Sequence, residues 1–360
     1  MLGFMSKLAV LTSGGDAPGM NSALRAIAKT CAGRGTELVG VELGYEGLID
    51  GAFRPLTERR GATLTTTVEV DRCGGWGGTV LGSARSERFR SAEGRAQAAE
   101  RLAAEGVDGL LVIGGNGSLT GAQLLADEHG VAIVGLPASI DNDIGATGMA
   151  IGVDTALGTI IDACDRISDT ASAHRRAFLV EVMGRDCGYL AMASAVAAGA
   201  DAVLMREQGR DDAAVIDAVE QTIRRGFERG KRQVLIIKSE GVRLPCTKLV
   251  REVNARIEGD LVRATVLGHV VRGGRPSYQD RRIASRLGFQ AVLAMERGRV
   301  GTMTAWRPTV KDAERTEDPT VGLVPLSRVI EETQRVLDGT SEVMRWRLQM
   351  MERIAGVLGV

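Results

Sequence analysis

Short apolar runs alternate with amphipathic helical patterns along almost the whole of this 360-residue chain. Runs that are apolar at successive positions are typical of strands buried on both faces, as in a parallel sheet covered by helices. The alternation therefore predicts an α/β fold of doubly wound, three-layer lobes with mostly parallel sheets. The expected strands are residues 7–11, 37–41, 109–113, 131–135, 177–183, 202–205, 233–237 and 263–267, and the expected helices are residues 20–30, 92–104, 118–126, 155–171, 189–198, 211–228, 249–258, 280–296, 326–337 and 341–354.

The length favours two lobes. A typical domain has about 150 residues, so the chain has room for between two and three. We expect residues 1–150 to form the first lobe, residues 151–325 the second, and residues 326–360 a set of C-terminal helices that can pack back. Residues 306–320, which are charged and hold two prolines, are expected to be an exposed loop. Open α/β sheets bind ligands at the carboxyl ends of their strands, so the active site is expected in the cleft between the lobes.

The composition argues against several functional classes. The 45 Lys and Arg balance the 45 Asp and Glu, and aromatic residues make up only 3%. A protein that binds nucleic acid through charge needs an excess of Lys and Arg, and one that binds it through stacking needs more aromatic residues. The five cysteines are scattered and the three histidines lie far apart, which predicts reduced thiols and no zinc site. The first apolar run is interpreted as a buried strand rather than a signal peptide. We therefore expect a cytoplasmic protein without membrane or nucleic-acid partners.

Two glycine-rich loops each join an expected strand to an expected helix. They are residues 12–21 (TSGGDAPGMN) and residues 113–118 (IGGNGS). Glycines let the backbone approach a phosphate, and the amides at the start of the next helix face it; Pro18 is expected to begin the first of these helices. The first loop is neither a GxGxxG fingerprint nor a Walker A loop. A tight turn explains each loop alone, but two such loops in one lobe favour a polyphosphate ligand.

Charged side chains follow three other expected strands. Asp141 and Asp143 stand two residues apart in the segment PASIDND, where one carboxylate could accept a proton and the other could hold water on a magnesium ion. A capped turn is the open alternative. The segments EVMGR (residues 181–185) and RATVLGHVVRGG (residues 263–274) carry cations that could bracket a sugar phosphate. Taken singly, each of these cations is more simply a solvated loop residue.

Together these motifs resemble the phosphofructokinase family, whose members phosphorylate fructose 6-phosphate at its 1-hydroxyl. The match runs in order from Leu8 to about Ala294 and includes GSAR at residues 82–85 and SEG at residues 239–241. The resemblance implies transfer of the γ-phosphoryl group of ATP, with Mg²⁺, to give fructose 1,6-bisphosphate and ADP in glycolysis. It also implies an allosteric homo-oligomer, usually a tetramer, because Arg176 and Arg263 typically reach into a neighbouring subunit's site.

The resemblance assigns a role to each site residue. Asp141 would be the catalytic base, with Ser139 beside the transferring phosphoryl group, while Arg85 and Arg185 offset its charge. The implied donor site is Gly15, Tyr45, Arg85, Gly115, Asn116, Gly117 and Ser118; the implied sugar-phosphate site is Ser139, Asp141, Arg176, Met183, Gly184, Arg185, Glu240, Arg263, His269 and Arg272; and the implied magnesium site is Asn116 and Asp143.

The chain departs from the family pattern near the donor. Asn116 stands where the family has a magnesium-binding Asp, and Ala138 stands where it has Gly or Lys. Pyrophosphate-using relatives have Asp at the position of Gly117 and Lys at that of Ala138, so ATP is the expected donor. A pyrophosphate-dependent enzyme and a catalytically weak regulatory or sensor homologue remain the alternatives. Asn116 favours the second of these, and the intact Asp141 and Arg85 oppose it.

A further departure concerns the family's effector site. Ser168 and Gln233 stand where a common bacterial form has Arg and His, so effector responses are expected to be weaker or to use another ligand. Positive charge is kept at Arg25, Lys29, Arg229 and Lys231.

Overall fold

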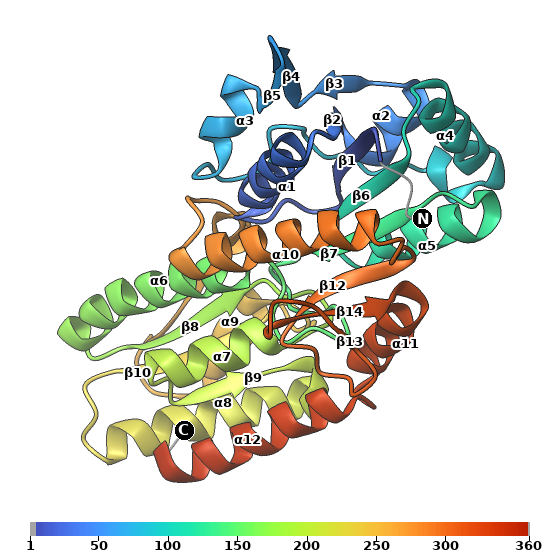
Figure 1. The fold of residues 1–360 in the computed structure, drawn as a ribbon. Coiled ribbons are helices and arrows are strands. Elements are labelled where there is room, and N and C mark those ends of the chain that lie inside the picture. The colour runs from blue at the N-terminus through green and yellow to red at the C-terminus, as the bar shows by residue number, and fades with distance from the viewer. Residues whose placement is uncertain (1–4, 359–360) are drawn as a thin grey trace. The chain divides into compact units, whose positions relative to one another are not determined.

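The computed structural model describes residues 5–358, so the first four residues of the predicted first lobe and the last two of the C-terminal segment lie outside it. The described residues form two compact units (Figure 1). Unit 1 holds the residues up to Ile140, then Ile144–Thr155 and Arg272–Gln334; unit 2 holds Asp141–Asp143, Ala156–Val271 and the residues from Arg335. The predicted α/β class is confirmed. The contacts divide the chain differently from the predicted boundaries, because residues 272–334 return to the first unit.

Unit 1 is built on an eight-stranded sheet with the order β13-β14-β12-β7-β6-β1-β2-β3. Its central strands, from β12 to β2, are parallel, while β3, β13 and β14 join by antiparallel pairing. Strands β1, β6 and β7 are buried almost throughout, as their apolar runs predict. The strands of unit 1 are β1 (Lys7–Ser13), β2 (Glu37–Val41), β3 (Phe53–Pro55), β4 (Thr57–Arg60), β5 (Thr63–Thr66), β6 (Gly109–Gly114), β7 (Ile133–Pro137), β12 (Thr302–Trp306), β13 (Glu314–Arg315) and β14 (Val321–Pro325).

The helices of unit 1 pack on this sheet in two groups. α1 and α10 lie along each other (Figure 1), and Gly288 permits the contact, because a Cβ there would stand 3.1 Å from the carbonyl oxygen of Ala23. In the other group, α2 contacts β1, α5 contacts β6 and β7, and α4 packs against both of these helices. The bounds are α1 (Met20–Arg34), α2 (Gly44–Asp50), α3 (Val68–Cys73), η1 (Arg88–Arg90), α4 (Ala92–Ala104), α5 (Asn116–His129), α10 (Tyr278–Glu296) and α11 (Leu326–Leu337), whose last residues count with unit 2.

Unit 2 contains a parallel four-stranded sheet with the order β11-β8-β10-β9. Alternate residues of its strands, such as Leu179 and Ile236, join α8 and α9 in one buried apolar core, while α7 contacts β9 and β10. The bounds are α6 (Val153–His174), which starts in unit 1, β8 (Ala177–Val182), α7 (Tyr189–Ala198), β9 (Ala202–Leu204), η2 (Arg206–Gln208), α8 (Asp212–Glu228), β10 (Val234–Ser239), α9 (Cys246–Arg256), β11 (Val262–Val266), η3 (Gly268–Arg272) and α12 (Glu342–Leu358).

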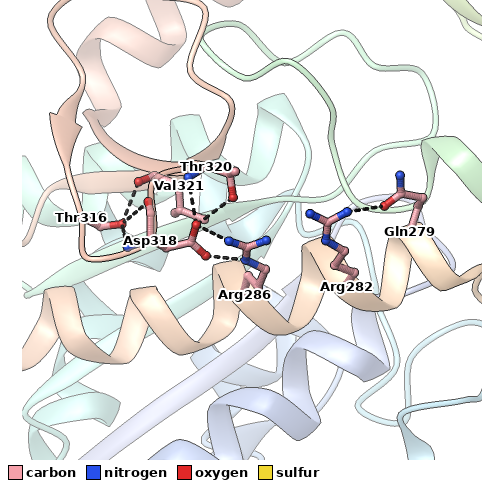
Figure 2. A network of polar contacts seen from close by, with 7 residues as sticks. All are labelled: Gln279, Arg282, Arg286, Thr316, Asp318, Thr320 and Val321. Carbon is pink, nitrogen blue, oxygen red and sulfur yellow. Dashed lines mark hydrogen bonds and ion pairs between the residues drawn. The ribbon is translucent and has the colours of Figure 1, made fainter.

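The expectation of one exposed loop over residues 306–320 was wrong in part. Trp306 is buried at the end of β12, and the segment contains β13. Figure 2 shows why the rest is ordered: the carboxylate of Asp318 pairs with Arg286 of α10 and accepts the amide and hydroxyl of Thr320 at 2.9 and 2.7 Å. The hydroxyl of Thr316 donates to the carbonyl of Val321 at 2.7 Å. Asp318 therefore accepts hydrogen bonds from both α10 and its own loop, and these bonds order the segment.

A buried carboxylate joins the starts of α6 and α10 within unit 1. Asp280 is fully buried and accepts the amides of Gly152 and Thr155, each at 2.8 Å, and the hydroxyl of Thr155 at 2.6 Å. Burial raises the pKa of Asp280, and these donors oppose the rise. Ser277 caps α10 through the amide of Asp280 and donates to Asp154 at 2.6 Å. Asp280 thus accepts amides at the start of α6, while Ser277 caps α10 itself and ties its start to Asp154 of α6.

Asp280→Ala should lower the free energy of unfolding by about 2 to 4 kcal/mol, because it leaves buried amides of α6 without their acceptor. Urea unfolding followed by circular dichroism measures the change. Ser285→Ala, at an exposed position of the same helix, is the control and should stay within about 0.5 kcal/mol of the parent. Equal stability of both variants would contradict the capping role.

Candidate active site

The two glycine-rich loops leave adjacent parallel strands of unit 1 and lie side by side. β1 and β6 pair with Ser13 opposite Gly114. A Cβ on Gly14, whose φ is +88°, would stand 3.2 Å from the Oγ of Ser118, and a Cβ on Gly114 would stand 2.7 Å from the same atom. The loops can approach this closely only because glycine occupies both positions. Their backbones form one surface at the carboxyl edge of the sheet.

The helices after the two loops start differently. α5 begins at Asn116, and its N-cap residue Gly115 has no side chain with which to cap the first amides. The positive end of the α5 dipole therefore faces the loop edge, which suits an anion. α1 begins at Met20 rather than at Pro18, so that expectation was wrong. Gly19, with φ +113°, precedes α1, and Pro18 lies in a turn in which Met20 donates to the carbonyl of Ala17 at 3.2 Å.

A third segment is tied to the first loop by two hydroxyls. Thr12 donates to the carbonyl of Gly82 at 2.8 Å, and Ser83 donates to the carbonyl of Gly14 at 2.6 Å. These bonds bring Arg85, an exposed residue, into the same neighbourhood as the glycine loops. Neither hydroxyl was predicted to have a role, because Thr12 and Ser83 stood out in the sequence only as members of longer motifs.

Tyr45 supports the second loop from inside the fold. Its ring stacks on Phe89 with centroids 3.9 Å apart, and its hydroxyl donates to the carbonyl of Ser118 at 2.6 Å. The side chain is buried, and burial raises the pKa of Tyr45. Tyr45, which the resemblance implies for the donor site, thus holds the backbone of Ser118 through a hydrogen bond.

Arg272 lies against the first glycine loop. Its Nη1 donates to the carbonyl of Asp16 at 3.3 Å and would stand 2.7 Å from a Cβ on Gly15. Arg272 belongs to unit 1, whereas His269 and Arg263, with which the resemblance groups it, belong to unit 2. Its positive charge is therefore placed beside the donor loop in this structure.

Ser139 follows β7 next to the second loop. Ala138 donates its amide to Gly114 at 2.9 Å, and Ser139 donates its amide to Ile151 at 3.1 Å. A Cβ on Gly115 would stand 4.0 Å from the Cβ of Ser139. Gly117 differs, because no described atom lies within 4 Å of the place that a Cβ would take there. The predicted donor residues of unit 1 are thus gathered at one sheet edge, with space at Gly117.

In unit 2, Asp141 pairs with the cation that the sequence placed after β8. The Asp141 side chain is 4% exposed, and its Oδ2 lies 3.7 Å from the Nε of Arg185. Arg185 has a φ of +49°, and Gly184 before it has a φ of +140°. A Cβ on Gly184 would stand 2.5 Å from the carbonyl oxygen of Cys187, so only glycine fits. This backbone aims Arg185 at Asp141.

Glu240 fixes the same loop from β10. Its Oε1 accepts the amides of Gly184 at 3.1 Å and Arg185 at 2.7 Å, and its own amide donates to Val182 at 2.9 Å. Met183 is buried between these points. The implied sugar-phosphate residues Met183, Gly184, Arg185 and Glu240 therefore form one connected loop.

The other implied sugar-phosphate residues of unit 2 stand at β11. Arg263 donates from Nη1 and Nη2 to the two carboxylate oxygens of Asp260 at 2.9 and 2.7 Å. The Arg263 hydrogen bonds hold the pKa of Asp260 below its usual value, with a smaller contribution from the charge of Arg176. His269 is exposed in η3. Asp260, which was not singled out in the sequence, thus holds Arg263.

The residues implied for magnesium suit an ion that enters bound to substrate phosphates. Among the described residues no three His, Cys, Asp or Glu side chains form a group that could hold an ion. Asn116 presents an amide oxygen, 3.5 Å from the hydroxyl of Thr120, and Asp143 is half-buried. Mg²⁺ needs only one or two protein oxygens when substrate phosphates and water complete its shell. Asn116 in unit 1 and Asp143 in unit 2 therefore each offer an oxygen of the kind that suits a phosphate-borne Mg²⁺.

Three of the four cations implied for effector binding, Arg25, Lys29 and Lys231, have carboxylate partners. Within unit 1, Lys29 pairs with Asp71, and Arg25 lies 3.8 Å from the same carboxylate. Lys29 is the main cause that lowers the pKa of Asp71. Within unit 2, Lys231 pairs with Asp201.

No described helix is both long and apolar enough to cross a bilayer.

Comparisons with known proteins agree with the resemblance. The family model described as Phosphofructokinase matches residues 7–295. The "ATP-dependent 6-phosphofructokinase" of Thermotoga petrophila is 47% identical over 301 residues, which cover 84% of this chain and 90% of that protein. The "ATP-dependent 6-phosphofructokinase 1" of Thermus thermophilus is 40% identical over 335 residues, covering 91% of this chain and 99% of that protein.

Solved structures share the fold. Phosphofructokinase from Saccharomyces cerevisiae has a TM-score of 0.81 and 32% identity over 96% of this chain, and the chain spans only half of that protein. The pyrophosphate-dependent phosphofructokinase of Marinobacter aquaeolei has a TM-score of 0.74 over 90% of this chain and 84% of that chain, but its identity of 20% supports only the fold.

Gly184→Ala should lower the free energy of unfolding by about 2 to 4 kcal/mol, because alanine is strained at this φ and its Cβ meets a backbone oxygen. Thermal unfolding measures the loss. Gly158→Ala is the matched control, since it lies in α6 with no described atom within 4 Å of its Cβ position. The control should be neutral or stabilise by up to about 1 kcal/mol. Similar melting temperatures for both variants would show that position 184 tolerates a side chain.

Proposed function

The chain belongs to the phosphofructokinase family, and we propose that it transfers the γ-phosphoryl group of ATP to the 1-hydroxyl of fructose 6-phosphate, a step of glycolysis. The observation that carries the proposal is the pair of adjoining glycine loops, Gly14–Gly15 and Gly115–Gly117, in a chain 47% identical to a protein named ATP-dependent 6-phosphofructokinase. Such loops suit a polyphosphate, and the products are fructose 1,6-bisphosphate and ADP.

In this mechanism, Asp141 accepts the proton of the sugar 1-hydroxyl as its oxygen attacks the γ-phosphorus. Arg185, 3.7 Å from Asp141, offsets charge on the transferring group, and Ser139 contacts that group. Arg85 and the loop amides bind the donor phosphates. Phosphoryl transfer depends mainly on such positioning and charge neutralisation. Mg²⁺, when bound, neutralises charge on the phosphate oxygens and would be held by Asn116 and Asp143.

Binding of the sugar phosphate supplies the orientation. Glu240, Met183 and Gly184 contact the sugar, while the cations hold the distant 6-phosphate, so that binding energy far from the reaction positions the 1-hydroxyl. Arg176 and Arg263 complete the site of a neighbouring subunit, so the working form is a homo-oligomer, with a tetramer as the expected size. We place the enzyme in the cytoplasm, with weakened effector control. The cations of the phosphate set are Arg176, Arg263 and His269, and the resemblance adds Arg272, whose Nη1 bonds the carbonyl of Asp16 in the donor loop.

A coupled assay for fructose 1,6-bisphosphate, run with ATP and with pyrophosphate at matched magnesium, tests the proposal. ATP should support the faster turnover. Faster turnover with pyrophosphate would assign the chain to the other donor class. No turnover with either donor would leave the regulatory or sensor role as the better account.

Gly117→Asp should raise the KM for ATP at least about tenfold, because a carboxylate at this open position repels the donor phosphates and fills their space. The KM for fructose 6-phosphate should stay within about twofold of the parent. Steady-state kinetics at saturating magnesium measure both constants. Gly158→Asp adds the same charge at an open position of α6 and should change neither. An unchanged KM for ATP would remove Gly117 from the donor site.

Asp141→Asn should lower kcat at least about a hundredfold, because the amide cannot take the hydroxyl proton. Affinity for fructose 6-phosphate should persist, since the side chain is nearly isosteric. Calorimetry of sugar-phosphate binding and steady-state kinetics separate the two effects. Asp169→Asn, at an exposed position of α6, should match the parent. Near-parental turnover of Asp141→Asn would mean that another group is the base.

Asn116→Asp should lower the magnesium concentration needed for half-maximal activity and leave kcat at least as high as in the parent. Asparagine keeps a neutral oxygen ligand but lacks the charge that attracts a hard cation. Titration of activity with magnesium at fixed ATP measures the change. An unchanged magnesium requirement would mean that Asn116 only shapes the turn. Activity that appears only in Asn116→Asp would favour a regulatory subunit.

A further inference from the structure

The C-terminal helix α12 lies beyond residues 7–295, the part of the chain that the family model matches. Within unit 2, α12 packs on the segment that leads from Arg185 into α7. Met344 is buried in one apolar cluster with Cys187 and Val336, and Tyr189 and Leu348 pack against this cluster. The apolar contact fixes the helix beside the loop that carries Arg185.

Arg347 is the charged residue that α12 buries at this contact. It is 6% exposed, its guanidinium carbon lies 4.4 Å from the ring centroid of Tyr189, and its Nη1 is 3.5 Å from the carbonyl oxygen of Asn142. A buried guanidinium is costly unless aromatic faces, acceptors or anions compensate it. The ring of Tyr189 and the carbonyl of Asn142 supply part of that compensation.

Asn142 stands between Asp141 and Asp143 and has a left-handed φ of +50°. Such a conformation is sparsely populated by residues other than glycine and persists where neighbours hold it. The thiol of Cys187 feels the charges of both Arg347 and Asp143. Burial raises the pKa of the Cys187 thiol to about 12, and Arg347 opposes this rise while Asp143 adds to it.

We propose that Arg347 is a positioning residue for the catalytic loop: it holds the carbonyl of Asn142, and thereby the directions of Asp141 and Asp143, from a helix outside the matched family segment. The inference rests on the proposed role of Asp141 as base. Arg347 does not touch the substrate in this account. It acts through the backbone between the two carboxylates, with Tyr189 as the surface on which its guanidinium is stacked.

Arg347→Met tests the role, because methionine fills much of the space without the charge or the donors. We expect kcat to fall about tenfold to a hundredfold, as for a slightly misplaced catalytic group, with both KM values within about twofold of the parent. Arg347→Lys keeps the charge and should recover more than half of the loss on a logarithmic scale. Arg345→Met, at an exposed position of the same helix, is the matched control and should keep parental kinetics.

Hydrogen exchange gives a readout that does not depend on activity. Amides of residues 141–144 should exchange faster in Arg347→Met than in Arg345→Met. If the parent is active and Arg347→Met changes neither kcat nor the exchange of residues 141–144, the positioning role is overturned and the proposed function stands. Losses of kcat and melting temperature that are equal in the Met and Lys variants would also overturn it, since they indicate a purely structural role.

Two further outcomes are separable. If the parent shows no sugar kinase activity but its loop exchange responds to Arg347→Met, the proposed function fails and the positioning contact stands. If Arg347→Met does not fold, Tyr189→Leu replaces it, because that change removes the stacking surface and leaves the arginine. Tyr189→Leu should then lower kcat without changing either KM, and a parental kcat would overturn the inference.

Discussion

The parallel register of β1 and β6, with Ser13 opposite Gly114, fixes where the two glycine loops of the donor side stand. Parallel strands end at the same edge, so the register brings Gly14 and Gly115 together. A slip of one residue would turn the alternating side chains to the opposite faces and separate the two turns. The hydroxyls of Thr12 and Ser83 then add the Gly82–Arg85 segment to this edge.

In unit 2, a buried charge pair fixes the register of two strands. β8 and β10 pair with Glu181 opposite Lys238, and the Nζ of Lys238, which is almost fully buried, lies 2.7 Å from the Oε2 of Glu181. The thiol of Cys246 donates to the same oxygen at 3.1 Å. A buried pair of this kind adds little net stability but penalises every register that would separate its members. The loops at Gly184 and at Glu240 begin only a few residues beyond it.

The sequence predicted most elements because their apolar periods are strong. Residues 37–41, 92–104, 189–198 and 326–337 form the expected strand and helices within the expected bounds. Small elements such as α2 and β13 were missed, since a few residues carry too little periodicity. The strand expected at residues 131–135 lies at Ile133–Pro137, because burial continues into the segment before Ala138.

The site was predictable where a motif is local and not where it depends on distant packing. The glycine loops and the Asp141 segment could be found by their residue types. The place of Arg272 beside Gly15 could not, because 257 positions of the chain separate them and only the α1–α10 packing brings the segments near. Arg347 gives no signal in the sequence, since an arginine in an amphipathic helix is ordinarily solvated.

The division of the chain has a consequence for its synthesis. Unit 1 needs β12 and α10, yet the ribosome makes all of Ala156–Val271 of unit 2 before it reaches them. Until then β7 is an open edge of a parallel sheet, with its apolar face toward α10 uncovered. Exposed edges of this kind are the surfaces through which nascent chains associate. The nascent chain therefore passes through a stage in which the sheet of unit 2 is complete while the sheet of unit 1 still lacks β12, β13 and β14.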